Sequence, residues 1–147
     1  MIWVVVSNTN RCLIFHYDKK MHHLTLAKEM LHPPSKLKGV DLISDAQGRY
    51  KTNVGSGGSF SAHAHENPRE VEFEQFAREV GKELDEGRRN NAYDNIILIT
   101  SPHMSGLIHK HLNPHVKAFM LPDIHKDYSH LTGNELITVV KEELRGF

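Results

Sequence analysis

The chain has 147 residues, with 18 basic and 18 acidic side chains, 12 histidines and a single cysteine. This length predicts one domain, residues 1–147, with a core that needs no disulfides or metal to hold it. The lone Cys12 excludes an intramolecular disulfide and a C-x-x-C site, and the balanced charge excludes the strongly basic profile of proteins that coat duplex DNA. The apolar residues 1–6 lack a basic leader and no run approaches the roughly 18 residues of a membrane span, so we expect a cytoplasmic protein without a membrane segment.

The first thirty residues predict a three-stranded antiparallel meander. Ser7–Asn10 is rich in residues that tolerate turns, and Asp18–Lys20 interrupts the second apolar run. Leu24, Leu26 and Met30 have even spacing, which predicts one buried face for the third strand. The predicted strands are Ile2–Val6, Arg11–Tyr17 and Leu24–Met30.

Residues 32–66 show no hydrophobic periodicity and form a predicted long glycine-rich loop. Four glycines lie between Gly48 and Gly58. Loops longer than about 15 residues are uncommon in compact domains and are usually functional or disordered. Between His32 and His65 the basic residues outnumber the acids, Asp41 and Asp45, by two; they are Lys36, Lys38, Arg49 and Lys51.

A long helix is predicted to follow this loop. Asn67 is the expected cap, Pro68 the first helical residue and Glu70 the capping-box partner. The predicted apolar stripe is Phe73, Phe76, Ala77, Val80 and Leu84. Because the opposite face is strongly acidic, we interpret it as solvated; its acids are Glu72, Glu74, Glu79, Glu83, Asp85 and Glu86.

The last third of the chain predicts two parallel strands and two helices. Asp94–Thr100 is apolar on both faces, as in a central parallel strand. Ser101 and Pro102 begin a short predicted helix, which must end at Asn113–Pro114. Val116–Leu121 is the next predicted strand. Thr132–Glu135 is a predicted capping box for the final helix. The whole pattern predicts an α/β fold of ribonuclease H type, with a mixed five-stranded sheet flanked by helices.

The sequence gives little support for nuclease activity or for catalysis by a nucleophilic side chain. A two-metal nuclease of this topology needs carboxylates on the first and fourth strands, and neither predicted strand supplies them. Cys12 lies within an apolar strand, which predicts a core residue. Ser101 and His103 place a hydroxyl near an imidazole at a strand-to-helix turn, but no Gly-x-Ser-x-Gly elbow surrounds them. Hydrolase activity through these two residues stays an alternative.

The histidines raise the question of a metal site. His63 and His65 could chelate a metal from an extended segment. His109 and His111 diverge on a helix, and Asn113–Pro114 separates His111 from His115. We therefore expect no bound metal or other cofactor, and interpret the histidine excess as a modifier of surface charge in mild acid.

The glycine run Gly55–Ser59 is the most specific local feature of the chain. Such a run lets backbone amides approach a phosphate closely, but no Walker lysine follows it. Together with the basic residues around it, this run favours contact with RNA phosphates over small-molecule catalysis.

Several short motifs, taken in order, give the chain a family resemblance. They are Trp3–Val6 with Asn8, Arg11–Phe15, Asp41–Asp45 with Gly48–Arg49, Phe76–Glu79 with Leu84, Tyr93–Asp94, and Lys126–Asp127. In this order they resemble the bacterial proteins required for attachment to host cells, over nearly the whole chain. That family is similar in turn to the central domain of archaeal and eukaryotic peptide-chain release factors and of Pelota.

The resemblance implies a release-factor-like domain with a working loop before its long helix. In release factors this loop carries a Gly-Gly-Gln motif that positions water for ester hydrolysis at the ribosome. Here the corresponding residues are Gly57, Gly58 and Ser59, so the glutamine is missing. The resemblance therefore implies contact with the ribosome more than hydrolysis.

The sequence thus predicts a binding protein that is non-catalytic or weakly catalytic. The expected partner is the ribosome or structured RNA, through Lys36, Lys38, Arg49, Lys51, Gly55, Gly57, Gly58 and Ser59. A second hypothesis is a protein-interaction module that serves host attachment. A third is a histidine-dependent metal-binding protein or hydrolase, with His63 and His65 as the candidate metal ligands.

Overall fold

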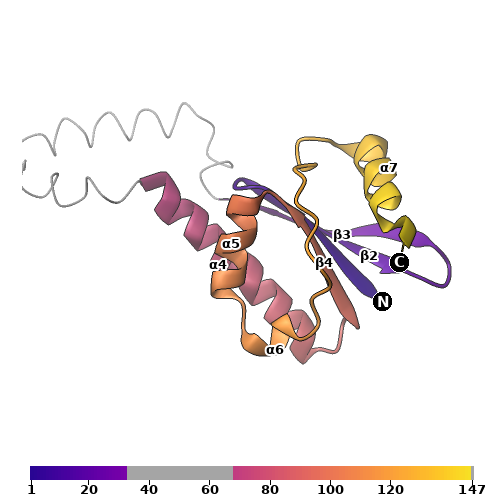
Figure 1. Ribbon diagram of the computed structural model, residues 1–147, viewed down its shortest axis with the longest axis horizontal. Coiled ribbons are helices and arrows are strands. Elements are labelled where there is room, and N and C mark those ends of the chain that lie inside the picture. The colour runs from indigo at the N-terminus through magenta and orange to yellow at the C-terminus, as the bar shows by residue number, and fades with distance from the viewer. Residues whose placement is uncertain (33–67, 147) are drawn as a thin grey trace, which may run out of the picture.

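The computed structural model of the protein describes residues 1–32 and 68–146. They form an α/β structure in which a four-stranded mixed sheet is flanked by helices (Figure 1). The strands are β1 (Ile2–Ser7), β2 (Arg11–Asp18), β3 (His23–Leu31) and β4 (Asn95–Thr100). The helices are α4 (Pro68–Arg89), α5 (Pro102–His111), α6 (Pro114–Lys117) and α7 (Gly133–Glu143), with a final 3₁₀ turn, η1 (Leu144–Gly146).

The sheet has the order β3-β2-β1-β4, so β1 is an internal strand. It pairs antiparallel with β2 and parallel with β4, and all six of its residues are buried. The predicted meander and the predicted parallel strand are therefore confirmed. A strand buried on both faces has a continuous apolar sequence, which explains the residues from Ile2 to Val6.

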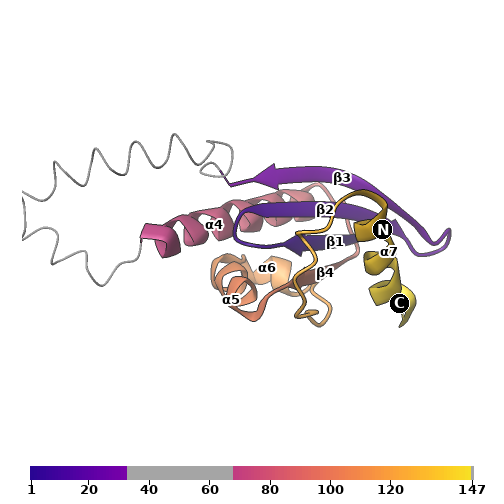
Figure 2. The ribbon, with the colours of Figure 1, turned by 90° about the horizontal axis from the view of Figure 1, so that it is seen from above.

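Two apolar clusters cover the two faces of the sheet. On one face, α4, α5 and α6 pack over Val5, Ile14 and Leu98. On the other face, α7 and η1 pack over Val4 and Phe15. The helices of the two clusters lie on opposite sides of the strands (Figures 1 and 2). No helix within residues 1–32 and 68–146 is long and apolar enough to cross a membrane.

The predicted fifth strand, Val116–Leu121, is wrong. Asn113 caps a short helix by accepting the His115 amide at 2.8 Å, and Pro114 opens that helix, so α6 occupies the start of the expected strand. The chain then runs beside β4 with isolated parallel bridges at Met120 and Ile124. Pro122 lies between these bridges and has no amide to donate, so a continuous ladder does not form.

The predicted single buried face of β3 is also wrong. A register shift between Ile14 and Phe15 makes Leu26 pair with Phe15 and Met30 pair with Cys12. Phe15 and Cys12 belong to opposite apolar clusters, so Leu26 and Met30 lie on opposite faces. Leu26 is 48% exposed. An extra residue in one strand inverts the inside–outside pattern beyond it, and even spacing in the sequence cannot reveal that.

The helix boundaries follow the predicted signals with one exception. α4 begins at Pro68 and α5 begins after Ser101, whose hydroxyl accepts the Met104 amide. The predicted cap Asn67 lies outside the described residues. At α7, Thr132 is the cap residue but its side chain makes no capping bond, so the predicted capping box does not form. The chain enters this helix through Gly133 in the left-handed region, φ +60°, which changes the direction of entry.

We expect opposite effects from alanine at two helical glycines. A Cβ at Gly87 would lie 2.5 Å from the Trp3 ring and 2.9 Å from the Tyr93 ring, and both rings are buried. G87A should lower the free energy of unfolding by about 1–3 kcal/mol, as overpacking does. A Cβ at Gly106 meets nothing within 4 Å, so G106A should raise it by about 0.5–1 kcal/mol through helix propensity. Urea unfolding measures both, and effects of the same sign would contradict this packing.

Candidate functional site at the carboxyl edge of the sheet

The carboxyl ends of β1 and β4 meet at one edge of the sheet. Ser7 and Thr100 are register partners there and both are fully buried. The Thr100 hydroxyl donates to the Ser7 carbonyl oxygen at 2.7 Å, and the Ser7 hydroxyl is within 3.0 Å of the Asn8 carbonyl oxygen. In α/β sheets ligands bind beyond the carboxyl ends of parallel strands, so this edge is the first place to look for a site.

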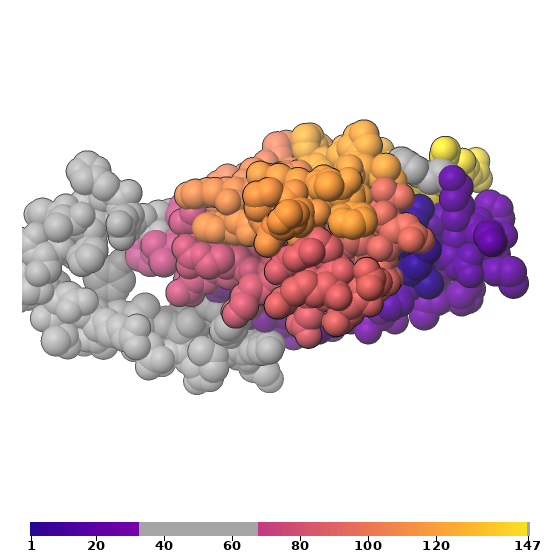
Figure 3. Space-filling view, turned by 90° about the horizontal axis from the view of Figure 1, so that it is seen from below, coloured from indigo at the N-terminus to yellow at the C-terminus, as the bar shows by residue number. Residues whose placement is uncertain are grey.

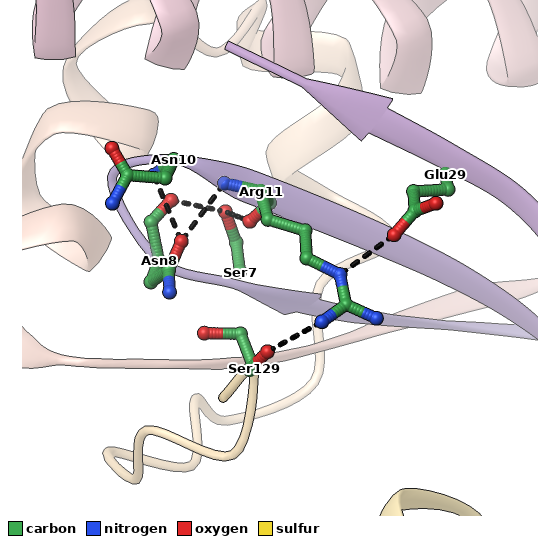
Figure 4. Close-up of polar contacts among 6 residues, drawn as sticks. All are labelled: Ser7, Asn8, Asn10, Arg11, Glu29 and Ser129. Carbon is green, nitrogen blue, oxygen red and sulfur yellow. Dashed lines mark hydrogen bonds and ion pairs between the residues drawn. The ribbon is translucent and has the colours of Figure 1, made fainter. Parts of the chain in front are cut away.

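The turn from β1 to β2 is fixed by one side chain. Asn8 Oδ1 accepts the backbone amides of Asn10 and Arg11, each at 2.8 Å, and the Asn8 amide donates to the Arg11 carbonyl oxygen at 2.9 Å (Figure 4). An asparagine that bonds to the backbone two and three residues later is a strong turn former. The predicted turn at Ser7–Asn10 is therefore confirmed.

Arg11 joins three segments that are distant in the sequence. Its Nε donates to Glu29 on β3 at 2.7 Å, and one terminal nitrogen donates to the Ser129 carbonyl oxygen at 2.9 Å (Figure 4). A planar guanidinium can hold several acceptors in fixed directions, which lysine cannot do. Arg11 thus ties the β1–β2 turn to the edge strand and to the loop before α7.

Glu143, the last residue of α7, also anchors the loop before α7. Its carboxylate accepts Lys126 Nζ at 2.7 Å and the Tyr128 hydroxyl at 2.6 Å. The bonds from Lys126 and then Tyr128 lower the pKa of Glu143 below its ordinary value, and the same carboxylate raises the pKa of both partners. The loop is therefore anchored at Tyr128 and at Ser129, next to the edge.

The chain enters and leaves residues 33–67 at this same edge. His32 is only 3% exposed, its amide donates to the Asn10 carbonyl oxygen at 2.9 Å, and its Nε2 donates to the Glu72 carbonyl oxygen of α4 at 2.9 Å. Its ring meets Phe76 edge to face at 5.5 Å. The last residue before the segment is thus bonded to the first turns of the helix after it.

The other predicted site residues are placed as follows. Residues Lys36, Lys38, Arg49, Lys51, Gly55, Gly57, Gly58, Ser59, His63 and His65 lie outside the described part of the chain. Ser101 Oγ is occupied as the cap of α5, and His103 Nε2 lies 3.1 Å from Glu70 of α4, so the two do not form a nucleophile–base pair. Cys12 is buried, as predicted, and burial raises the pKa of its thiol to about 12, which leaves it unreactive.

Four of the histidines between residues 103 and 130 lie near carboxylates: His103, His109, His111 and His125. His109 Nε2 lies 2.7 Å from Asp123, whose same oxygen accepts the Ser105 hydroxyl at 2.5 Å, and His125 Nε2 lies 3.9 Å from it. In a catalytic triad the imidazole stands between serine and acid, whereas here the acid stands between them. We interpret this group as a brace that holds the segment after α6 against α5. Within residues 1–32 and 68–146, no group of three or more histidine, cysteine or acidic side chains could hold a metal ion.

Sequence reasoning missed both the brace and the partners of the acidic residues of α4. Glu74 accepts Lys110 Nζ at 2.5 Å and lies 3.2 Å from His111 Nε2; Glu83 lies 2.9 Å from Lys28 Nζ. Asp85 is held by Arg88 at 2.9 Å. The interpretation of this face as solvated did not include these three ion-pair partners. Only the Asp85–Arg88 pair, at helical spacing, could have been found from the sequence.

The comparisons with known proteins place the chain in a family. The family model described as "Protein required for attachment to host cells" matches residues 3–140. The chain belongs to this family. The predicted resemblance to host-attachment proteins is thereby confirmed, and the match covers nearly the whole chain. No curated protein matches it significantly.

The fold is similar to part of a solved structure described as an archaeal protein. The identity is 12% and the TM-score is 0.50, over 95% of this chain. The chain covers 32% of that protein's length. At this identity the similarity concerns the fold alone.

Unfolding measured at acid pH should show how much Glu143 contributes to stability. Because its pKa is lowered in the folded state, its contribution to stability is present above the ordinary value near 4.5 and is lost as the pH falls through the folded pKa. At pH 7 the free energy of unfolding of E143Q should therefore be lower than that of the native chain. The difference should be about 1 kcal/mol or less, because these groups are near solvent. Between pH 5 and pH 3, E143Q should lose less stability than the native chain does. Urea unfolding at several pH values measures this.

The matched control is E142Q. Glu142 is on the same helix, is 61% exposed and contacts only Arg145, at 3.3 Å, among the described residues. It should keep the native dependence on pH. Equal curves for E143Q and E142Q would contradict the anchoring of the loop by Glu143.

Proposed function

We propose that this protein binds the ribosome or structured RNA through residues 33–67, presented from the carboxyl edge of the sheet, and that it is a binding protein and not an enzyme. The observation that carries the proposal is the contact of His32 with Glu72, which closes the base of this segment onto α4. A binding loop whose two ends are fixed side by side loses less conformational freedom when it binds.

The composition of the segment supports a polyanionic partner. It combines Lys36, Lys38, Arg49 and Lys51 with the glycine run that ends in Gly57–Gly58–Ser59. Lysine and arginine supply the charge that phosphates attract, and glycines let the backbone come close. The segment also precedes the long helix α4, as the Gly-Gly-Gln loop does in the release factors that the motifs resemble. The missing glutamine favours binding without ester hydrolysis.

Ribosome co-sedimentation at low and moderate salt tests this proposal. The native chain should sediment with ribosomes at low salt and less at moderate salt, because binding releases counterions from phosphates. R49A/K51A should weaken binding and flatten its salt dependence by about one unit of slope for each phosphate that is no longer neutralised. R89A/K117A removes the same charge from exposed positions on α4 and α6 and should bind like the native chain. No sedimentation at either salt concentration would overturn the proposal.

The base of the segment provides a test that leaves the arginines and lysines intact. H32L places an apolar side chain against Phe76 and removes the hydrogen bond to the Glu72 carbonyl oxygen. We expect a weaker ribosome complex with an unchanged slope against salt, because the basic side chains that neutralise phosphates are all still present. H115L is the control, since His115 is exposed on α6. If H32L binds ribosomes with the affinity of the native chain, the contact of His32 with Glu72 is not needed for binding.

Attachment to host cells remains the second candidate function, and membership of the family favours it. It would use the same chain as a protein-interaction module. Cell fractionation separates the two proposals. A pool exposed at the cell surface would favour the attachment role, whereas a pool confined to the ribosomal fraction would favour the first.

A further inference from the structure

A groove lies between α4 and the carboxyl end of α5, away from the carboxyl edge. Its volume is about 450 Å³, and its polar lining comprises Arg78, Lys82, Asp85, Lys110, His111 and Asn113. The two helices approach closely because α4 has Gly81 here; a Cβ at that position would lie 3.0 Å from the His111 carbonyl oxygen. Residues of α4 and of α5–α6 adjoin each other on the face shown in Figure 3.

Two acids near this groove, Asp85 and Glu74, already have partners. Asp85 contacts Arg88 at 2.9 Å and Arg89 at 3.6 Å, both on its own helix. Glu74, beside the groove, contacts Lys110 and His111, and these bonds keep its pKa below the ordinary value. Neither carboxylate contacts the two remaining cations of α4 that line the groove.

Those two cations are Arg78 and Lys82. Among the described residues neither has an ion-pair partner, and both side chains are exposed. They are four residues apart on the helix, where like charges repel. A bound anion between them would replace this repulsion with two attractions.

We propose that the groove binds a phosphate group. An arginine presents paired donors that match phosphate oxygens, and a lysine adds a point charge. Asn113 contributes a third donor, because its Oδ1 accepts the His115 amide and its Nδ2 remains for a ligand. The phosphate is either free, as in a small phosphorylated molecule, or a phosphodiester of RNA. The proposed site is built from described residues outside 33–67, so its test is separate from the test of the proposed function.

Titration with sodium phosphate at constant ionic strength, followed by amide NMR and calorimetry, tests the site. The full chain should show saturable shifts at the amides of Arg78–Lys82 and Asn113. R78Q/K82Q should lower the affinity by about tenfold or more, as removal of charge-assisted bonds does. Without phosphate this variant should be at least as heat-stable as the native chain, because the repulsion is gone. K117Q/K141Q, which removes two exposed lysines elsewhere, should keep native affinity.

Shifts no larger than those caused by sodium chloride at the same ionic strength would overturn the proposal, as would native affinity in R78Q/K82Q. A second titration uses a short single-stranded RNA on the R49A/K51A chain, which lacks two of the basic side chains proposed to contact RNA. RNA shifts in the groove that phosphate competes away identify a phosphodiester as the ligand. Saturation by phosphate without RNA shifts identifies a free phosphate. Both of these results support the site.

Discussion

The parallel pairing of β1 with β4 is the constraint on which the other parts of the structure depend. β1 is buried along its whole length between β2 and β4, so its backbone groups are satisfied only by these two neighbours. The chain must return across the sheet to place β4 parallel to β1, and α4 makes this crossing. The crossing brings the ends of β1, β3 and β4 and the starts of α4 and α5 to one edge.

The polar contacts at that edge are built from residues far apart in the chain. Arg11 bonds to Ser129, Thr100 bonds to Ser7 and His32 bonds to Glu72. Buried polar groups require such partners, since an unpaired one costs about 1–3 kcal/mol. The edge is therefore a rigid base for the segment that leaves it after His32. A rigid base with a basic, glycine-rich segment suits recognition of a large anionic partner.

Charge is organised by contacts that the net value of zero conceals. Three acids of α4, Glu74, Glu83 and Asp85, are paired with Lys110, Lys28 and Arg88 from three different elements. Two histidines of α5 also face carboxylates: His103 lies near Glu70 and His109 near Asp123. Arg78 and Lys82 of α4 have no ion-pair partner among the described residues, and they lie beside a groove. Neutrality of the whole chain is thus compatible with the two phosphate-binding regions that we propose.

The sequence by itself determined the elements whose signals are local: the meander, the apolar β4, the starts of α4 and α5, and the Asn8 turn. These depend on alternation, caps and turn residues, which act over a few positions. Tertiary structure alone decided the absence of a fifth strand after α6 in the described chain, the shifted face of β3 and the missing cap bond at Thr132. It also decided which acid meets which base. Apart from pairs at helical spacing such as Asp85 and Arg88, these pairings depend on how distant segments pack, and spacing along one segment carries no information about them.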